Sequence, residues 1–294
     1  MAATLRRLPA LAGLAVLAGT GAEFAGHHAF ARQVRRDVQA LRAGASPGRA
    51  GVVTEEMLAE LPEPVRRYLR YTGVVGKPFP GTVQLRQKGQ MRLGPGQRWV
   101  PLDAEEHYPV QPPGFVWAGT ARMGPFPVAR ARDMYAEGGG RLPAKVASLW
   151  PVADASGEQM DQAGMLRYLS EMIWFPAAFL AGNISFEAAD DSSARVTLTG
   201  HGRTATTTLF SGTQGRLTDF VAHRYRTPTS SDPWSTPVTG YGEFEGLRLP
   251  ASATATWKLP DGDLEYINLT LTGLHYDTGP ADRASAPPPE GSGR

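Results

Sequence analysis

The chain has 294 residues, a formal net charge of +2 and no cysteine. This length buries a sizeable core, and the absence of cysteine excludes disulfides, thiolate metal sites, cysteine nucleophiles and a lipidated cysteine. The charge is uneven, because residues 1–50 hold seven arginines and two acids, net +5, which leaves −3 for the remainder. The positive charge therefore lies beside an apolar N-terminal segment, which favours anionic lipid head groups over nucleic acid as its partner.

The N-terminal segment is uncharged from Leu8 to Ala22 and follows Arg6 and Arg7. These fifteen residues are fewer than the roughly 20 of a membrane span and are typical of a signal peptide. A tilted anchor remains the alternative. The arginines that follow the segment would hold the domain in the cytoplasm by the positive-inside rule, but we favour an extracytoplasmic domain at the cell membrane.

Composition divides the chain into four parts. We predict a signal peptide or membrane anchor over residues 1–31 and a membrane-proximal helix and linker over residues 32–52, because the linker is rich in Gly, Pro and Ser. The folded domain is expected over residues 53–277. The Pro-, Ser- and Gly-rich tail, residues 278–294, is expected to be disordered.

Two short helices are predicted at the start of the domain. Thr54, followed by two glutamates, is typical of a helix N-cap, and that helix ends by Leu61. A second helix follows Pro62, and Gly73 is its predicted C-cap.

From Gly81 the apolar residues recur with period two, which predicts about ten strands joined by tight turns. The predicted strands include 83–93, 99–104, 115–123, 128–135, 141–146, 195–199, 204–210, 217–225, 238–244, 252–259 and 264–272.

One helix interrupts these strands, with Asp161 as its predicted N-cap and apolar residues at helical spacing as far as Pro176. It is apolar nearly all round, so we expect it to be buried. The sequence therefore predicts a mainly β (α+β) domain: a curved antiparallel sheet or half-open β-barrel wrapped around a buried helix, preceded by an N-terminal apolar helix.

Several motifs resemble those of an uncharacterised bacterial family that is usually anchored at its N-terminus. They are Leu61-Pro-Glu-Pro-Val-Arg-Arg-Tyr68, the Asp133 to Gly140 turn, Glu171-Met-Ile-Trp-Phe-Pro176, and Gly240 to Gly246 followed by Trp257 and Asp261 to Tyr266. The likeness covers about residues 54–276. The layout also looks like the periplasmic lipoprotein-carrier fold, whose half-barrels hold acyl chains. The first resemblance implies no catalytic roles, and the second is architectural.

Glu171 is the leading candidate for a functional residue, because a carboxylate on an apolar helix must pair, protonate or line a polar cavity. Arg167 or Arg224 could pair with it. The alternatives are a structural ion pair, a contact to a ligand and a general acid or base.

Other candidates are side chains that could line an apolar pocket or orient a ligand within it. The aromatic candidates are Trp117, Trp174, Trp257, Tyr241 and Tyr266, and the polar candidates are Arg224 and Glu243. Plain core packing is the alternative for the aromatics, and surface charge for the polar pair.

No catalytic, metal or cofactor motif is present in the sequence. The six histidines lack ligand spacing, and Gly44-Ala-Ser46-Pro-Gly48 lies in the linker rather than in a strand-to-helix turn. We therefore expect no metal, no cofactor and no catalytic residue. The first hypothesis is a cell-envelope protein that binds a hydrophobic or lipid-like molecule; the second is a structural or interaction domain with a filled core, and the third an enzyme that uses Glu171.

Overall fold

The computed structural model describes residues 8–92, 94–124, 126–146, 150–227 and 229–278. Fourteen strands among these residues form one antiparallel sheet. Its order is β6-β5-β4-β3-β2-β1-β14-β13-β11-β10-β9-β8-β7, with β12 also paired to β13. The first half of the sheet is β1 (Thr82–Met91), β2 (Val100–Pro109), β3 (Phe115–Met123), β4 (Phe126–Ala136), β5 (Gly139–Val146) and β6 (Trp150–Ser156).

The second half is β7 (Ile184–Ala188), β8 (Ser193–Gly200), β9 (Arg203–Ser211), β10 (Leu217–Thr227), β11 (Ser230–Ser235), β12 (Val238–Phe244), β13 (Leu247–Trp257) and β14 (Leu264–Asp277). The first and last strands of the chain, β1 and β14, pair in the middle of the sheet. Successive side chains of a strand point to opposite faces of the sheet. In β1, Val83, Leu85 and Gln87 are buried on one face, and the residues between them are more exposed on the other.

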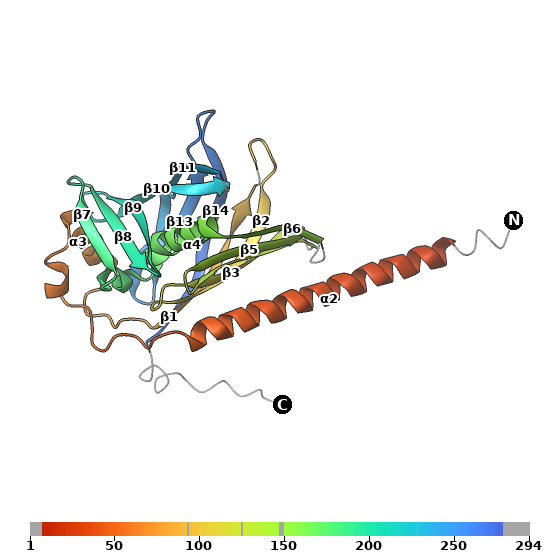
Figure 1. The fold of residues 1–294 in the computed structure, drawn as a ribbon, viewed down its shortest axis with the longest axis horizontal. Helices are drawn as coiled ribbons and strands as arrows, with labels where there is room; N and C mark the ends of the chain where they lie inside the picture. The colour runs from red at the N-terminus through yellow and green to blue at the C-terminus, as the bar shows by residue number, and fades with distance from the viewer. Residues whose placement is uncertain (1–7, 93, 125, 147–149, 228, 279–294) are drawn as a thin grey trace.

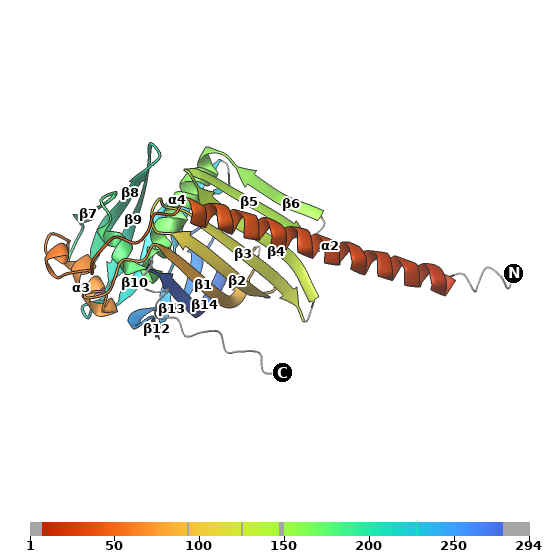
Figure 2. The same cartoon turned by 90° about the horizontal axis from the view of Figure 1, so that it is seen from below.

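The sheet curves around helix α4 (Glu158–Glu171), as Figures 1 and 2 show. The helix contacts β4, β5 and β6 on one side and β9 and β10 on the other. β5 and β9 are nine strands apart in the sheet order, and nine spacings of about 4.8 Å would separate them by roughly 40 Å in a flat sheet. One helix touches both, so the sheet must bend. The predicted mainly β, curved and open antiparallel sheet is confirmed.

The predicted buried helix is confirmed as α4, with different ends. It begins after Gly157, whose φ is 102°, and the side chain of Asp161 is not the N-cap. Instead Asp161 Oδ1 accepts a hydrogen bond from the backbone N–H of Gly140 at 2.8 Å. After Glu171 the chain continues as two 3₁₀ helices, η2 (Met172–Trp174) and η3 (Pro176–Leu180), because Pro176 cannot continue an α-helix.

Of the two helices predicted at the start of the domain, the second is confirmed and the first is corrected. η1 (Glu56–Leu58) is a single 3₁₀ turn with Glu55, not Thr54, at its N-cap. α3 (Glu63–Thr72) ends at Gly73, whose φ of 75° and N–H bond to the Arg70 carbonyl make it the predicted C-cap. Val65, Tyr68 and Leu69 of α3 are buried, at the spacing of one helix face.

Helix α2 (Leu8–Ala43) lies against the other face of the sheet and extends past its edge (Figures 1 and 2). It contacts β2 and β3, and Leu41 near its end is buried. Asp37 forms an ion pair with Arg132 of β4 at 2.9 Å. Among the residues that the structure describes, no helix has an apolar stretch long enough to cross a membrane. The predicted disordered tail falls outside the described residues, apart from Thr278.

Candidate functional site

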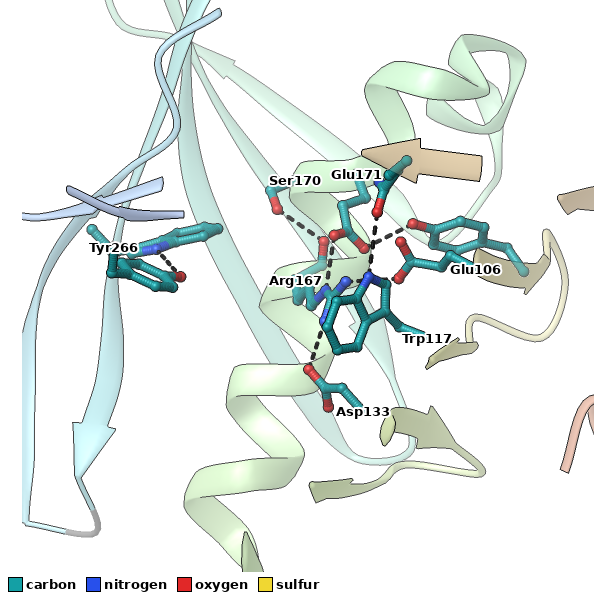
Figure 3. A network of polar contacts seen from close by, with 10 residues as sticks. Glu106, Trp117, Asp133, Arg167, Ser170, Glu171 and Tyr266 are labelled. Carbon is teal, nitrogen blue, oxygen red and sulfur yellow. Dashed lines mark hydrogen bonds and ion pairs between the residues drawn. The ribbon is translucent and has the colours of Figure 1, made fainter. Parts of the chain in front are cut away.

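A charge cluster surrounds Arg167 on α4, where the helix faces β2 and β4 (Figure 3). Arg167 Nε donates to Glu171 Oε1 at 2.8 Å, one helical turn away. Its Nη1 donates to Asp133 Oδ2 at 2.7 Å, and its Nη2 donates to Glu106 Oε1 at 2.9 Å. The guanidinium thus binds three carboxylates at once, which its planar fork of donors permits. Of the two predicted partners of Glu171, Arg167 forms the pair.

The register of the sheet places the other partners of Arg167 in one row. Glu106 of β2 pairs with Trp117 of β3, which pairs with Asp133 of β4. Directly paired residues point to the same face, so all three side chains face α4. The guanidinium lies 4.8 Å from the ring centre of Phe115 and 5.3 Å from that of Trp117. Those rings supply cation–π contacts that hold the cation in place.

The cluster is open on one side and closed beneath. The side chains of Arg167 and Glu171 are each 14% exposed, whereas that of Glu106 is fully buried. Burial raises the pKa of Glu106 well above its usual range; the Arg167 charge opposes the shift, and the nearby Glu171 and Asp133 carboxylates add to it. Three carboxylates against one guanidinium leave a surplus of negative charge, so protonation of Glu106 relieves part of that surplus.

Tyr108 connects the cluster to the aromatic core. Its hydroxyl donates to Glu171 Oε2 at 2.9 Å and also lies close enough to Glu106 to affect the pKa of that residue. Its ring contacts Phe115, Tyr168 and Phe175 at centroid distances of 6.3, 6.2 and 5.0 Å. Burial raises the pKa of Tyr108 well above its usual range, so this hydroxyl acts as a donor at neutral pH.

Two buried polar atoms on this face have no hydrogen-bond partner of good geometry: Gln87 Nε2, a donor, and Glu106 Oε2, an acceptor when ionised. Trp117 Nε1 donates to Gln87 Oε1 at 3.3 Å, which directs the Gln87 amide into the cluster. Gln87 is 2% exposed and Glu106 is 0% exposed. Unpaired polar atoms at this depth cost free energy unless a further polar group reaches them.

Small apolar residues cover the same face beyond the cluster, farther from α4. One row crosses six strands from β4 to β13 and consists of Ala129, Ala121, Leu102, Gly89, Leu269 and Ala253. Between this row and the cluster lies a second row of Ala131, Gly119, Ala104, Gln87 and Leu271. Ala129, Ala131, Leu269 and Ala253 are only half-buried, so part of this apolar face is accessible to solvent.

Trp117 lies flat along its strand because the residue two positions on is glycine. A Cβ built on Gly119 would fall 2.1 Å from Cη2 of the Trp117 ring, far inside contact distance. The Trp-Ala-Gly sequence therefore positions the indole beside the charge cluster and over the inner apolar row at Gly119.

An aromatic group forms on β11, β13 and β14. Trp257 and Tyr266 stack with ring centres 6.1 Å apart, and Trp234 Nε1 donates to the Tyr266 hydroxyl at 3.1 Å. Arg224 lies 4.9 Å from the Trp234 ring centre. Three of the predicted candidates, Trp257, Tyr266 and Arg224, are thus brought together, away from Glu171.

The remaining candidates lie apart from both groups. Trp174 is buried in η2 and donates through Nε1 to the Pro250 carbonyl at 3.0 Å. Tyr241 donates to the Leu217 carbonyl at 2.9 Å, and its ring meets Tyr71 edge-on at 5.3 Å. Glu243 is exposed on β12. Of the eight predicted residues, only Glu171 and Trp117 belong to the Arg167 cluster.

Sequence reasoning missed four members of the cluster: Glu106, Asp133, Gln87 and Tyr108. A signal was present for Glu106, since Leu102, Ala104, Glu106 and Tyr108 alternate on one face of β2, and an acid among buried positions indicates a partner. The described residues hold no group of three His, Cys, Asp or Glu side chains arranged to bind a metal ion.

Two cavities lie elsewhere. One of about 370 Å³ lies between the Ser46 to Arg49 linker and η3, and one of about 220 Å³ is lined by residues including Lys77, Phe175 and Tyr276. Neither of these two includes a member of the Arg167 cluster. Phe175 and Pro176, at the end of the predicted family motif, border the smaller cavity, and Ala177, which follows the motif, borders both.

The fold and the cluster define a curved-sheet protein with a polar centre on its helix-facing side. Residues 51–269 match a family of unknown function, DUF6544, and the chain belongs to that family. The family resemblance predicted from the motifs is confirmed. No curated protein matches the sequence.

Solved structures give more distant likenesses. A LolA superfamily protein from Nitrosomonas europaea is 10% identical, with 79% of this chain and 97% of that chain covered and a TM-score of 0.41. A DUF1329 family protein from Desulfovibrio piger is 8% identical, with 79% of this chain and 96% of that chain covered and a TM-score of 0.42. A lipoprotein-sorting protein domain from Vibrio parahaemolyticus is 8% identical, with 68% and 86% covered and a TM-score of 0.39. Likenesses at this level carry no argument about function.

Proposed function

We propose that this protein binds an amphipathic, lipid-like small molecule on the helix-facing side of its sheet. The observation that carries the proposal is the outer small-residue row beyond the Arg167 cluster, because half-buried apolar side chains on a curved face leave room for an apolar body. Large side chains would fill that space in an ordinary core, whereas four of the six residues in the outer row are Ala or Gly.

The polar cluster supports the same proposal from the other end of the ligand. Binding sites combine apolar walls with a few fixed polar groups that orient the ligand. The side chains of Arg167 and Glu171 keep a small exposed fraction, and three carboxylates and two aromatic rings hold the guanidinium in place. A head group would meet preorganised partners there.

We place the protein at the cell membrane, with its domain in the envelope. The support is the apolar segment from Leu8 to Ala22 and the arginines on both sides of it, a combination that suits a signal peptide or an anchor near anionic lipid.

Organic extraction tests the proposal directly. The full chain is purified from a native-like host without detergent, extracted with organic solvent and analysed by mass spectrometry. A stoichiometric amphipathic molecule supports the proposal. A blank extract, together with no binding of added lipid-like probes, would overturn it in favour of the structural domain with a filled core.

A matched pair of variants locates the binding face. Ala131→Leu adds a bulky side chain to the apolar face of β4, and Ala118→Leu adds the same group to the opposite face of β3. We expect Ala131→Leu to reduce the bound molecule by about tenfold, which corresponds to about 1.4 kcal/mol, and Ala118→Leu to leave it unchanged. Equal amounts of bound molecule in both variants would show that the ligand does not bind to this face of the sheet.

Acid–base catalysis at the same cluster is a second candidate, favoured by one observation: the Tyr108 hydroxyl contacts Glu171 while burial raises the pKa of neighbouring Glu106. Under that alternative, Glu171→Gln abolishes turnover of the extracted molecule but retains its binding. Under the binding proposal, the molecule leaves the site chemically unchanged.

A further inference from the structure

We infer that the ligand's polar end is a neutral hydroxyl group, and that Gln87 and Glu106 recognise it. This inference rests on the proposed function and makes it more specific. The ligand class is therefore a long-chain or isoprenoid alcohol, or an acylglycerol with a free hydroxyl, rather than a fatty acid, a phospholipid or an amine.

The first step is the position of the two unpaired atoms. Gln87 and Glu106 lie on neighbouring strands, and their register makes them diagonal neighbours on the helix-facing side: Gln87 pairs with Ala104, and Glu106 with Leu85. Diagonal neighbours have Cα atoms roughly 7–8 Å apart, and the side chains reach less than that. One small group between them can contact both Gln87 Nε2 and Glu106 Oε2.

The second step is hydrogen-bond chemistry. Gln87 Nε2 can only donate, so the ligand atom must accept a hydrogen bond, which an alkylammonium cannot do. Glu106 Oε2 accepts when the carboxyl is ionised and can donate when it is protonated. A hydroxyl donates and accepts, so it satisfies both side chains whichever form Glu106 takes.

The third step is charge. Glu106, Asp133 and Glu171 surround a single guanidinium, so the cluster is negative when all of them are ionised and stays negative when Glu106 is protonated. A carboxylate or phosphate would enter a buried region that already holds excess negative charge, which disfavours its binding. A neutral hydroxyl avoids that repulsion.

The fourth step is the path of the apolar chain. Gln87 belongs to the row that also contains Ala131, Gly119, Ala104 and Leu271, one step from the fully apolar row. The Trp117 indole covers this inner row at Gly119 and reaches Gln87, so the alkyl chain of a hydroxyl held at Gln87 would lie toward the outer row, over Gly89, Leu102 and Leu269.

The experiment uses the full chain and three probes with the same ten-carbon tail: 1-decanol, decanoic acid and decylamine. Each is titrated below its micelle concentration at pH 8, where the acid is ionised and the amine is protonated. Direct binding is measured by calorimetry. We expect decanol to bind at least about tenfold more tightly than either charged probe.

The outcomes separate this inference from the proposed function. Equal or tighter binding of decanoic acid or decylamine would overturn the hydroxyl assignment and leave an amphipathic site. No binding of any probe would overturn the proposed function itself. The comparison uses the wild-type chain, so it does not depend on a variant's folding.

A variant pair tests the residues. Gln87→Leu removes the unpaired donor and should weaken decanol binding by about tenfold, whereas Gln90→Leu on the exposed face of the same strand should change it less than about twofold. Gln87→Met removes the amide donor at nearly the same side-chain length and adds no charge, so it should show the same loss. Unchanged decanol affinity in both Gln87 variants would mean that water alone occupies the site, and would overturn the assignment.

Discussion

At the scale of single residues, Arg167 joins α4 to two strands at once. Its three carboxylate partners come from β2, β4 and its own helix, so one side chain fixes the helix against the sheet. A buried ion pair gives little net stability compared with apolar packing of the same shape, but removing one partner leaves uncompensated charge. The strongest residue-scale effects are therefore expected from unbalancing this cluster.

Arg167→Met leaves Glu106, Asp133 and Glu171 without their cation. We expect it to lower the free energy of unfolding by about 3–5 kcal/mol, measured by urea denaturation. Arg122→Met breaks the ion pair between Arg122 and Asp103, whose side chains are 41% and 46% exposed. This variant should lower the free energy of unfolding by no more than about 1 kcal/mol. Similar losses in both variants would contradict the role given to Arg167.

Neighbouring glutamates on β2 should show opposite pH dependences. The pKa of Glu106 is raised by burial, so the folded state holds its proton from the usual pKa near 4.5 up to a higher pH. Its contribution to stability is complete below that range and is lost as pH rises through the raised pKa. The pKa of Glu105 is lowered, first by its hydrogen bond with His107, so its contribution is present above its usual pKa and is lost as pH falls.

Urea denaturation from pH 8 down to about pH 3, below the usual glutamate pKa, checks this contrast. The free energy of unfolding of wild type minus that of Glu106→Gln should fall as pH rises, and the corresponding difference for Glu105→Gln should rise. Parallel curves for wild type and Glu106→Gln would show that Glu106 titrates normally in the folded protein.

At the scale of elements, strand β3 carries a tryptophan that depends on a glycine. Gly119→Ala would place a methyl group inside the Trp117 ring, so the indole must leave its place beside Arg167 and its hydrogen bond to Gln87. We expect a loss of about 1–3 kcal/mol in stability and a change in the near-UV circular dichroism spectrum. Gly182→Ala, which meets nothing within 4 Å, serves as the control. An unchanged near-UV spectrum for Gly119→Ala would contradict this packing.

Elements were predictable from the sequence where local patterns decide them. The alternation in β3 and β9 and the Gly73 C-cap appear as expected, whereas β13 begins at Leu247, before the predicted start at Ser252, and lacks a regular alternation. β11 was missed because its Ser-Ser-Asp-Pro-Trp-Ser sequence has the composition of a loop and pairs with β10 and β13 only through tertiary context. The cluster was predictable in part: Glu171 stood out on an apolar helix, but its meeting with Glu106 and Asp133 depends on which strands the curved sheet brings to α4.

At the scale of the whole molecule, α4 contacts strands near both ends of the sheet, and α2 lies along the opposite face of β2 and β3. The Asp37–Arg132 pair extends this contact to β4, with side chains 14% and 11% exposed. The two long helices therefore occupy opposite faces of the same strands, and the Arg167 cluster lies on the face of α4.

The central position of β14 has a consequence for how the protein is made. Of the described strands, β14 (Leu264–Asp277) comes last in the chain, yet it lies between β1 and β13, and its partner β1 begins at Thr82. Until those final residues are available, the strands before α4 and the strands after it form two sheets with no strand between them. Closing that gap is a long-range contact of the kind that slows folding, so a nascent chain that ends before Leu264 cannot complete the sheet, however many of the earlier strands have formed.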